Sequence, residues 1–199
     1  PEHISLYALT LEEETPLGRA VASGEVPAPD PDLAADMYLL AEELLETAGY
    51  QHYEISNWAR LGRECRHNLG YWRNRPYLGF GAGAHSYWGG YRFWAVASPA
   101  DYIARMDAAG HVSGGSADQL IRQLAPVQGM EAINKRLELA ETMILGLRLV
   151  EGVSLDEVSQ RFGQEAVAVY SRAKDELTRL GLLETDGDRL RLSARGRLL

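Results

Sequence analysis

Apolar residues recur at intervals of three and four along residues 31–48, which is the period of a helix with one apolar side. The positions are Leu33, Met37, Leu40, Leu44 and Ala48. Asp30 and Pro31 precede the run as a side-chain cap and a proline suited to the first helical turn, and Gly49 follows it. The pattern predicts an amphipathic helix over residues 31–48.

Polar and apolar residues alternate before and after this helix, as they do in strands. One face of a strand over residues 3–10 would hold His3, Ser5 and Tyr7, and one face of a strand over residues 50–56 would hold His52, Glu54 and Ser56. Strand, helix and strand form one crossover unit of a parallel sheet, so the predicted fold class is α/β. The polar faces would line a cavity or face solvent, and the alternation leaves both open.

Glycine and proline mark the organisation of residues 65–129. We expect a short helical turn over residues 67–72, a glycine-rich strand over 77–83 and a hairpin over 87–95 broken by two glycines. A helix should begin after Ser98, and a flexible glycine- and serine-rich connection follows it. We therefore predict a first domain over residues 1–110, a linker over 111–129 and a second domain over 130–199.

Residues 130–199 are largely helical by pattern. A first helix over about 130–148 carries the stripe Ile133, Leu137, Ala140, Ile144 and Leu147. Ser154 caps a second, short helix, and a third helix should bury Ala166, Val169 or Tyr170, Ala173, Leu177 and Leu180. Two short strands over 182–185 and 189–192, joined by an Asp-Gly turn, complete a winged-helix-like module.

Composition argues against several classes of protein and of binding site. The 199 residues carry a net charge of -8, which argues against a nucleic-acid partner, although the arginines near the hairpin keep DNA binding as a minor alternative. No apolar run approaches the roughly 18 residues that span a bilayer, so we expect no membrane span. The single cysteine excludes an internal disulfide and a three-cysteine iron–sulfur site, and it fits a cytoplasmic protein.

His67 is the main candidate for chemistry. It lies among Arg66, Arg73 and Arg75 and is followed by Tyr71 and Trp72. An imidazole nitrogen can bind iron, flat rings can stack on a macrocycle, and guanidinium groups can pair with carboxylates, which together would suit haem and its propionates. In the alternative interpretation His67 caps a turn or forms a hydrogen bond in the core, and spacing alone favours this second reading.

Two neighbouring features carry weaker signals. Cys65 and His67 could be part of a metal site, but structural zinc needs four ligands and no second pair is visible, so an inert thiol is the better interpretation. The glycines between Gly79 and Ala84 indicate that the backbone closely approaches either a ligand or a neighbouring strand. His85 would then face a cavity or belong to the core.

Four stretches of the chain resemble, in order, the second half of the radical-SAM haem chaperones of the HemW family. They are residues 3–9, 53–60, 64–72 and 77–86, and the resemblance continues through residues 141–148 and the C-terminal module. These chaperones are relatives of the oxygen-independent coproporphyrinogen III oxidases. The resemblance implies a C-terminal portion of such a protein, in which residues 1–110 are the closing part of a partial (β/α) barrel.

The resemblance also implies roles for particular residues. The family's haem-binding motif falls on His67, Asn68, Tyr71 and Trp72, with His67 as a ligand of the haem iron. The barrel interior would hold His52, Glu54 and Ser56, and S-adenosylmethionine would touch Gly81, Gly83, Ala84 and His85. The cysteine motif for the 4Fe-4S cluster belongs to the family's N-terminal half, so this chain alone should be inactive as an enzyme.

The implied function is to bind haem and pass it to acceptor proteins. The alternative is oxidative decarboxylation of coproporphyrinogen III, whose enzymes should lack the motif on His67, Asn68, Tyr71 and Trp72.

Overall fold

Three antiparallel sheets of three strands each organise the chain in the computed structural model, which describes residues 1–199. In the first sheet, β1 (His3–Ser5) and β2 (Gln51–Glu54) lie on either side of β3 (Asn57–Ala59), and both run antiparallel to it. The α/β class is confirmed, but the expected parallel sheet is wrong, because β1 and β2 each pair antiparallel with β3. A turn at Ile55 and Ser56 sends the chain back as β3, which then occupies the place between the two predicted strands.

Helices α1 (Pro16–Ala22) and α2 (Pro31–Thr47) connect β1 to β2. The predicted cap is confirmed, since the Asp30 side chain accepts hydrogen bonds from the backbone N–H groups of Asp32 and Leu33. The predicted apolar stripe, however, points away from the sheet: Leu33, Met37, Leu40 and Leu44 are between 55% and 62% exposed. Tyr38, Glu42 and Leu45 form the less exposed side of the helix.

The second sheet has the order β4 (His85–Trp88), β5 (Tyr91–Ala95) and β6 (Val127–Ala132). The predicted hairpin is confirmed, and its turn requires glycine because Gly89 and Gly90 have φ angles of 62° and 82°. Helices α4 (Pro99–Asp107) and α5 (Ala117–Gln123) connect β5 to β6. Residues 111–129, expected as a linker, therefore contain a helix and the first residues of a strand that pairs with β5.

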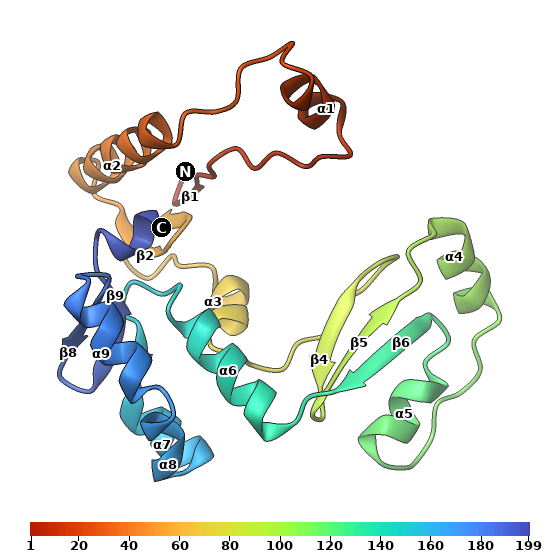
Figure 1. Ribbon diagram of the computed structural model, residues 1–199. Helices are drawn as coiled ribbons and strands as arrows, with labels where there is room; N and C mark the ends of the chain where they lie inside the picture. Colours follow the sequence, from red (N-terminus) through yellow and green to blue (C-terminus); the bar gives the residue numbers. More distant parts are fainter.

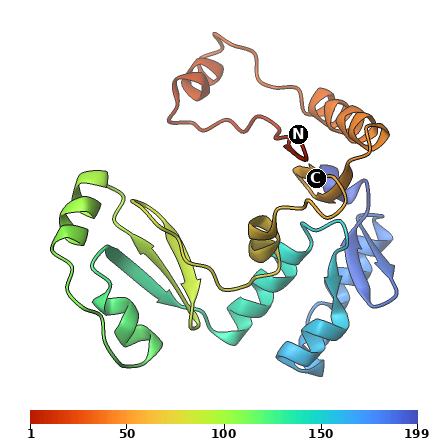
Figure 2. The same cartoon turned by 180° about the vertical axis from the view of Figure 1, so that it is seen from behind.

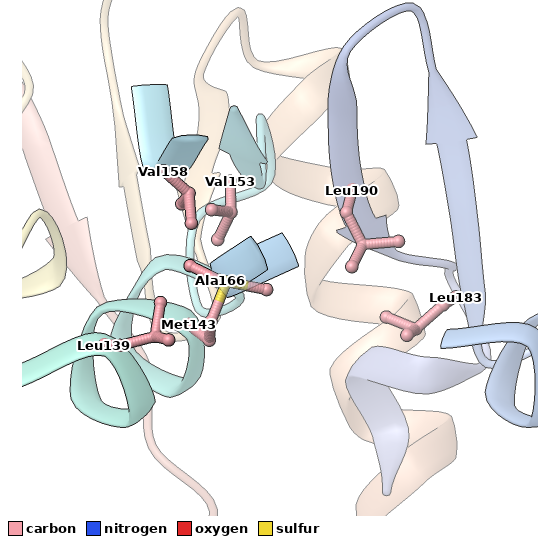
Figure 3. Close-up of a cluster of buried hydrophobic side chains, with 7 residues drawn as sticks. All are labelled: Leu139, Met143, Val153, Val158, Ala166, Leu183 and Leu190. Atoms are coloured by element: carbon pink, nitrogen blue, oxygen red, sulfur yellow. The ribbon is translucent and has the colours of Figure 1, made fainter. Parts of the chain in front are cut away.

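The C-terminal part contains α6 (Lys135–Gly146), α7 (Leu155–Phe162), α8 (Gln164–Ala168), α9 (Ser171–Arg179) and the 3-10 helix η1 (Gly196–Leu198). Its sheet has the order β7 (Val153–Ser154), β9 (Arg189–Leu192) and β8 (Leu183–Asp186). Helices and sheet enclose a core of seven buried side chains, shown in Figure 3: Leu139, Met143, Val153, Val158, Ala166, Leu183 and Leu190. The predicted hairpin and the Ser154 cap are confirmed.

Two predictions for this part are wrong in detail. In α6 the buried residues are Leu139, Met143 and Gly146, whereas Ile144 of the predicted stripe is 69% exposed. The helix has apolar residues on two sides, so spacing alone could not select the buried one. The predicted third helix is interrupted at Val169 and Tyr170, where the chain leaves α8 and enters α9.

The sheets and helices follow an open arc, with α1 near one end and the second sheet near the other, and the C-terminal part lies along the middle of the arc beside α6, as Figures 1 and 2 show from opposite sides. The two termini lie close together beside the first sheet. The accessible surface is 13024 Å², whereas a compact protein of 22.0 kDa would expose roughly 9,300 Å². None of the helices combines the length and the apolar character needed to cross a membrane.

Candidate functional site

The residues of the predicted haem motif lie on one short helix, α3 (Arg66–Trp72), between the first sheet and α6. The predicted helical turn is thereby confirmed. His67 and Tyr71 are one turn apart, and their rings meet edge-on with centroids 4.6 Å apart. Tyr71 makes the same kind of contact with Tyr77 at 4.5 Å, so three rings form a row along one side of the helix.

His67 is exposed, and its imidazole forms no hydrogen bond or ion pair within the chain. Two other histidines differ in this respect, because His3 bonds to Tyr53 and His52 bonds to Glu42. His67 borders a cavity of about 410 Å³, lined by Arg66, His67, Leu69, Gly70, Arg73, Arg75, Pro76 and Tyr77. The imidazole nitrogens are thus free to bind a ligand that enters this cavity. The alternative in which His67 forms a hydrogen bond in the core does not agree with its exposed position.

Trp72 lies on a different side of α3 from this cavity. The Arg148 guanidinium covers one face of its indole at 4.3 Å from the ring centroid, and the indole Nε1 is buried without a hydrogen-bond partner. Trp72 borders a second cavity of about 440 Å³ between α3 and the C-terminal part, together with residues of α6, α7 and β9. The motif therefore contributes to two cavities, and Arg73 and Arg75 border both.

Asn74 fixes the position of these two arginines and was not singled out by the sequence. It has a φ of 47°, the left-handed conformation that asparagine tolerates best among residues other than glycine, and it directly follows the C-cap of α3. Its side chain is buried and donates hydrogen bonds to the Thr142 hydroxyl (3.1 Å) and the Glu138 carbonyl (3.3 Å) of α6. The one sequence signal for this role was the presence of an asparagine just beyond a short helix, where a left-handed residue often ends the helix.

Asn68 and Tyr53 connect α3 to the first sheet. Asn68 is half-buried and lies beside the Tyr53 phenol. Burial raises the pKa of Tyr53, and the hydrogen bond with Asn68 partly offsets this effect. A neutral phenol therefore persists here, and it also bonds to the His3 imidazole at 2.8 Å. Asn68 does not line the cavity beside His67.

The residues expected in a barrel interior do not share one environment. His52 stacks on Trp58 with centroids 4.3 Å apart and bonds to Glu42 at 3.0 Å, so it packs toward α2. Glu54 is fully buried and accepts hydrogen bonds from Asn57 and from the backbone of Ser56. An irregularity in strand register between His52 and Glu54 breaks the alternation that placed them together.

The glycine-rich stretch forms a chain reversal instead of the predicted strand, and only Tyr77 bridges to Tyr87. A Cβ at Gly79 would lie 2.1 Å from the His85 carbonyl oxygen, so the close approach is to neighbouring backbone. Gly81 and Gly83 have φ angles of 103° and 71°, which favour glycine. Ala84 pairs with Ala95, and His85 is exposed and stacks on Trp94 at 5.8 Å.

The chain has no cluster of metal-binding side chains. No group of three or more His, Cys, Asp or Glu side chains could hold a metal ion, and Cys65 is a free, half-buried thiol. One cysteine does not fit a 4Fe-4S cluster, which takes three or more thiolates.

Comparisons with known proteins agree with the sequence motifs. Residues 133–199 match the family model described as the HemN C-terminal domain. The chain is 39% identical over 198 residues to "Heme chaperone HemW" of Mycobacterium tuberculosis, covering 100% of this chain and 45% of that protein. The Bacillus subtilis protein of the same name is 31% identical over 198 residues, with 100% and 48% covered. The resemblance to the HemW family is confirmed.

A solved structure supports the fold. It is described as coproporphyrinogen III oxidase (HemN) from Escherichia coli, a radical SAM enzyme, and it matches with a TM-score of 0.68 over 100% of this chain and 46% of that chain. The sequence identity is 17%, so this likeness concerns the fold alone. The chain spans about half the length of the curated relatives that it matches.

Proposed function

Because the chain carries the HemN C-terminal domain and aligns along its whole length with relatives named heme chaperone HemW, we propose that it is the haem-binding C-terminal part of such a chaperone. The observation that carries this proposal is the exposed, unbonded His67 imidazole at the edge of a cavity on the motif helix. Haem is the cargo, which the protein would pass to acceptor proteins in the cytoplasm.

The chemistry of the site suits a ferric or ferrous tetrapyrrole. A neutral imidazole is a common axial ligand of haem iron, and His67 has no internal partner to give up before it binds. The edge contact with Tyr71 orients the ring without occupying its nitrogens. Arg66, Arg73 and Arg75 around the same cavity offer guanidinium donors for the propionates.

The proposal extends to the two parts of the chain. Residues 1–110 would be the closing part of a partial (β/α) radical-SAM barrel and residues 130–199 a winged-helix-like domain, a division supported by the start of the family match at residue 133. A 4Fe-4S cluster would be held outside this chain. S-adenosylmethionine would contact the reversal at Gly81, Gly83, Ala84 and His85 only in the full-length protein.

The test is a titration with haem, followed in the Soret band. We expect His67→Ala to shift the Soret band and to weaken binding at least about tenfold, because the axial bond is lost. His111→Ala is the matched control, since His111 is also exposed but lies in the loop between α4 and α5. An unchanged spectrum and affinity for His67→Ala would overturn the assignment.

The full-length protein, which would also carry the 4Fe-4S cluster, distinguishes the oxidase alternative. When the protein is supplied with coproporphyrinogen III, S-adenosylmethionine and a reductant, a chaperone leaves the propionates intact. Release of carbon dioxide and formation of vinyl groups would instead favour the oxidase.

A further inference from the structure

The cavity of about 440 Å³ behind Trp72 gathers positive charge in an acidic chain. Its lining includes four guanidinium groups, from Arg73, Arg75, Arg161 and Arg189, and two carboxylates, from Glu151 and Glu157. The chain as a whole carries a net charge of -8. Cations concentrated in a hollow raise the local positive potential, which attracts anions. We refer to this cavity as the guanidinium cleft.

A carboxylate already lies between two of these groups. Arg73 Nη2 donates a hydrogen bond to Glu151 Oε1 at 3.0 Å, and Arg189 Nη1 is 3.8 Å from Glu151 Oε2. The Glu151 side chain thus occupies the place that the carboxylate of a ligand would take between two guanidinium groups. Arg75 is exposed and has no ion pair or side-chain hydrogen bond, so one cation of the cleft is unused.

The ion pairs of Glu151 are weak enough for the carboxylate of a ligand to replace them. The side chains of Arg73, Glu151 and Arg189 are 39%, 43% and 36% exposed, and ion pairs at such positions contribute little to stability. The pair between Arg92 and Glu141 shows the contrast: two parallel hydrogen bonds of 2.9 and 2.8 Å join it, and its side chains are 27% and 17% exposed. Hydrogen bonding to Glu141 raises the pKa of Arg92.

The guanidinium cleft adjoins the cavity beside His67. Arg73 and Arg75 border both, on either side of the buried Asn74, and Trp72 of the motif supplies a flat wall to the cleft. A planar ligand bound through His67 could therefore extend its acidic side chains past the end of α3 toward Arg189. Haem has two such side chains.

We propose that the guanidinium cleft binds the propionates of the haem, with Glu151 as an internal counter-ion that a propionate replaces. This inference rests on the proposed function and adds to it Arg189 of the C-terminal part, whereas Arg161 already pairs with Glu138. Arg189 would make haem affinity depend on contact between α3 and that part of the chain.

The test compares haem with haem dimethyl ester, which keeps the iron and the ring but lacks the carboxylates. We expect Arg189→Gln to weaken haem about five- to tenfold and Glu151→Gln to strengthen it about threefold, with no change for the ester. Arg191→Gln is the matched control: this residue of the same strand is 35% exposed and pairs with Glu184 and Asp186 outside the cleft.

The possible outcomes separate the two proposals. If haem still binds through His67 but neither substitution changes the ratio of haem to ester affinity, the cleft assignment is wrong and the proposed function stands. If the wild-type protein gives no Soret change with haem, both are wrong. Glu151→Gln is nearly isosteric and removes only the two exposed ion pairs with Arg73 and Arg189, so a result with this variant does not depend on tolerance of the arginine substitution.

Discussion

The Arg148 guanidinium lies 4.3 Å from the ring centroid of Trp72. The same guanidinium is 3.7 Å from the buried Glu54 carboxylate, and the Arg148 carbonyl accepts a hydrogen bond from the backbone of Ile55. One residue at the end of α6 thus joins the motif helix to the turn between β2 and β3. The position of Trp72 at the wall of the guanidinium cleft depends on this connection.

Arg148→Met should destabilise the protein by about 2 kcal/mol. Glu54 is fully buried, so losing Arg148 leaves its carboxylate without a counter-ion, although the hydrogen bonds to Glu54 Oε1 remain and the 35% exposure of Arg148 lowers the cost below that of a fully buried pair. Urea unfolding followed by circular dichroism measures the change. Arg63→Met is the control, because Arg63 and Glu2 are 60% and 66% exposed and their pair should contribute less than about 0.5 kcal/mol.

Asn74→Gly should cost less stability than Asn74→Ala. Both variants lose the hydrogen bonds to α6, but alanine also adopts a φ of 47° unfavourably, which adds about 1 kcal/mol. The same unfolding assay measures the difference. Equal losses for the two variants would show that the backbone conformation at residue 74 adds nothing.

Stability should fall above about pH 10. Burial raises the pKa values of Tyr38, Tyr53, Tyr77 and Tyr87 above the value near 10 of an unfolded chain. The unfolded state therefore releases these protons first, so the stabilisation is complete below pH 10 and is lost as the pH rises through the folded-state values. Unfolding midpoints between pH 8 and 11 measure the loss, and Tyr87→Phe should make it smaller. A pH dependence identical to that of the wild type would contradict the role of Tyr87.

Local signals in the sequence predicted most helices, caps and hairpins, because these depend on neighbouring residues. The predicted helix caps form at Asp30 and Ser154, and the predicted glycine turn forms at Gly89. Local signals could not predict that β3 lies between β1 and β2, because β1 comes from a distant part of the chain.

The residues of the candidate site could be recognised from the sequence only in part. His67, Tyr71 and Trp72 stood out as residue types, and the motif placed them on one helix. Arg148, Glu151 and Arg189 reach the site from beyond residue 140, and a surface arginine or glutamate has no distinctive local pattern. Their contribution became visible only when the C-terminal part was placed beside α3.

The outward apolar stripe of α2 leads to a final prediction. Leu40 and Leu44 are 55% and 60% exposed, so replacing both with glutamine should change the unfolding free energy of the chain by less than about 0.5 kcal/mol. The replacement should lower the binding of the dye ANS and reduce self-association in sedimentation experiments, because both respond to contiguous exposed apolar surface. Leu45→Gln is the control on the less exposed side of the same helix, and it should destabilise the chain instead. If the double variant unfolds at clearly lower urea concentration, the stripe is packed against the rest of this chain and is not an exposed apolar surface.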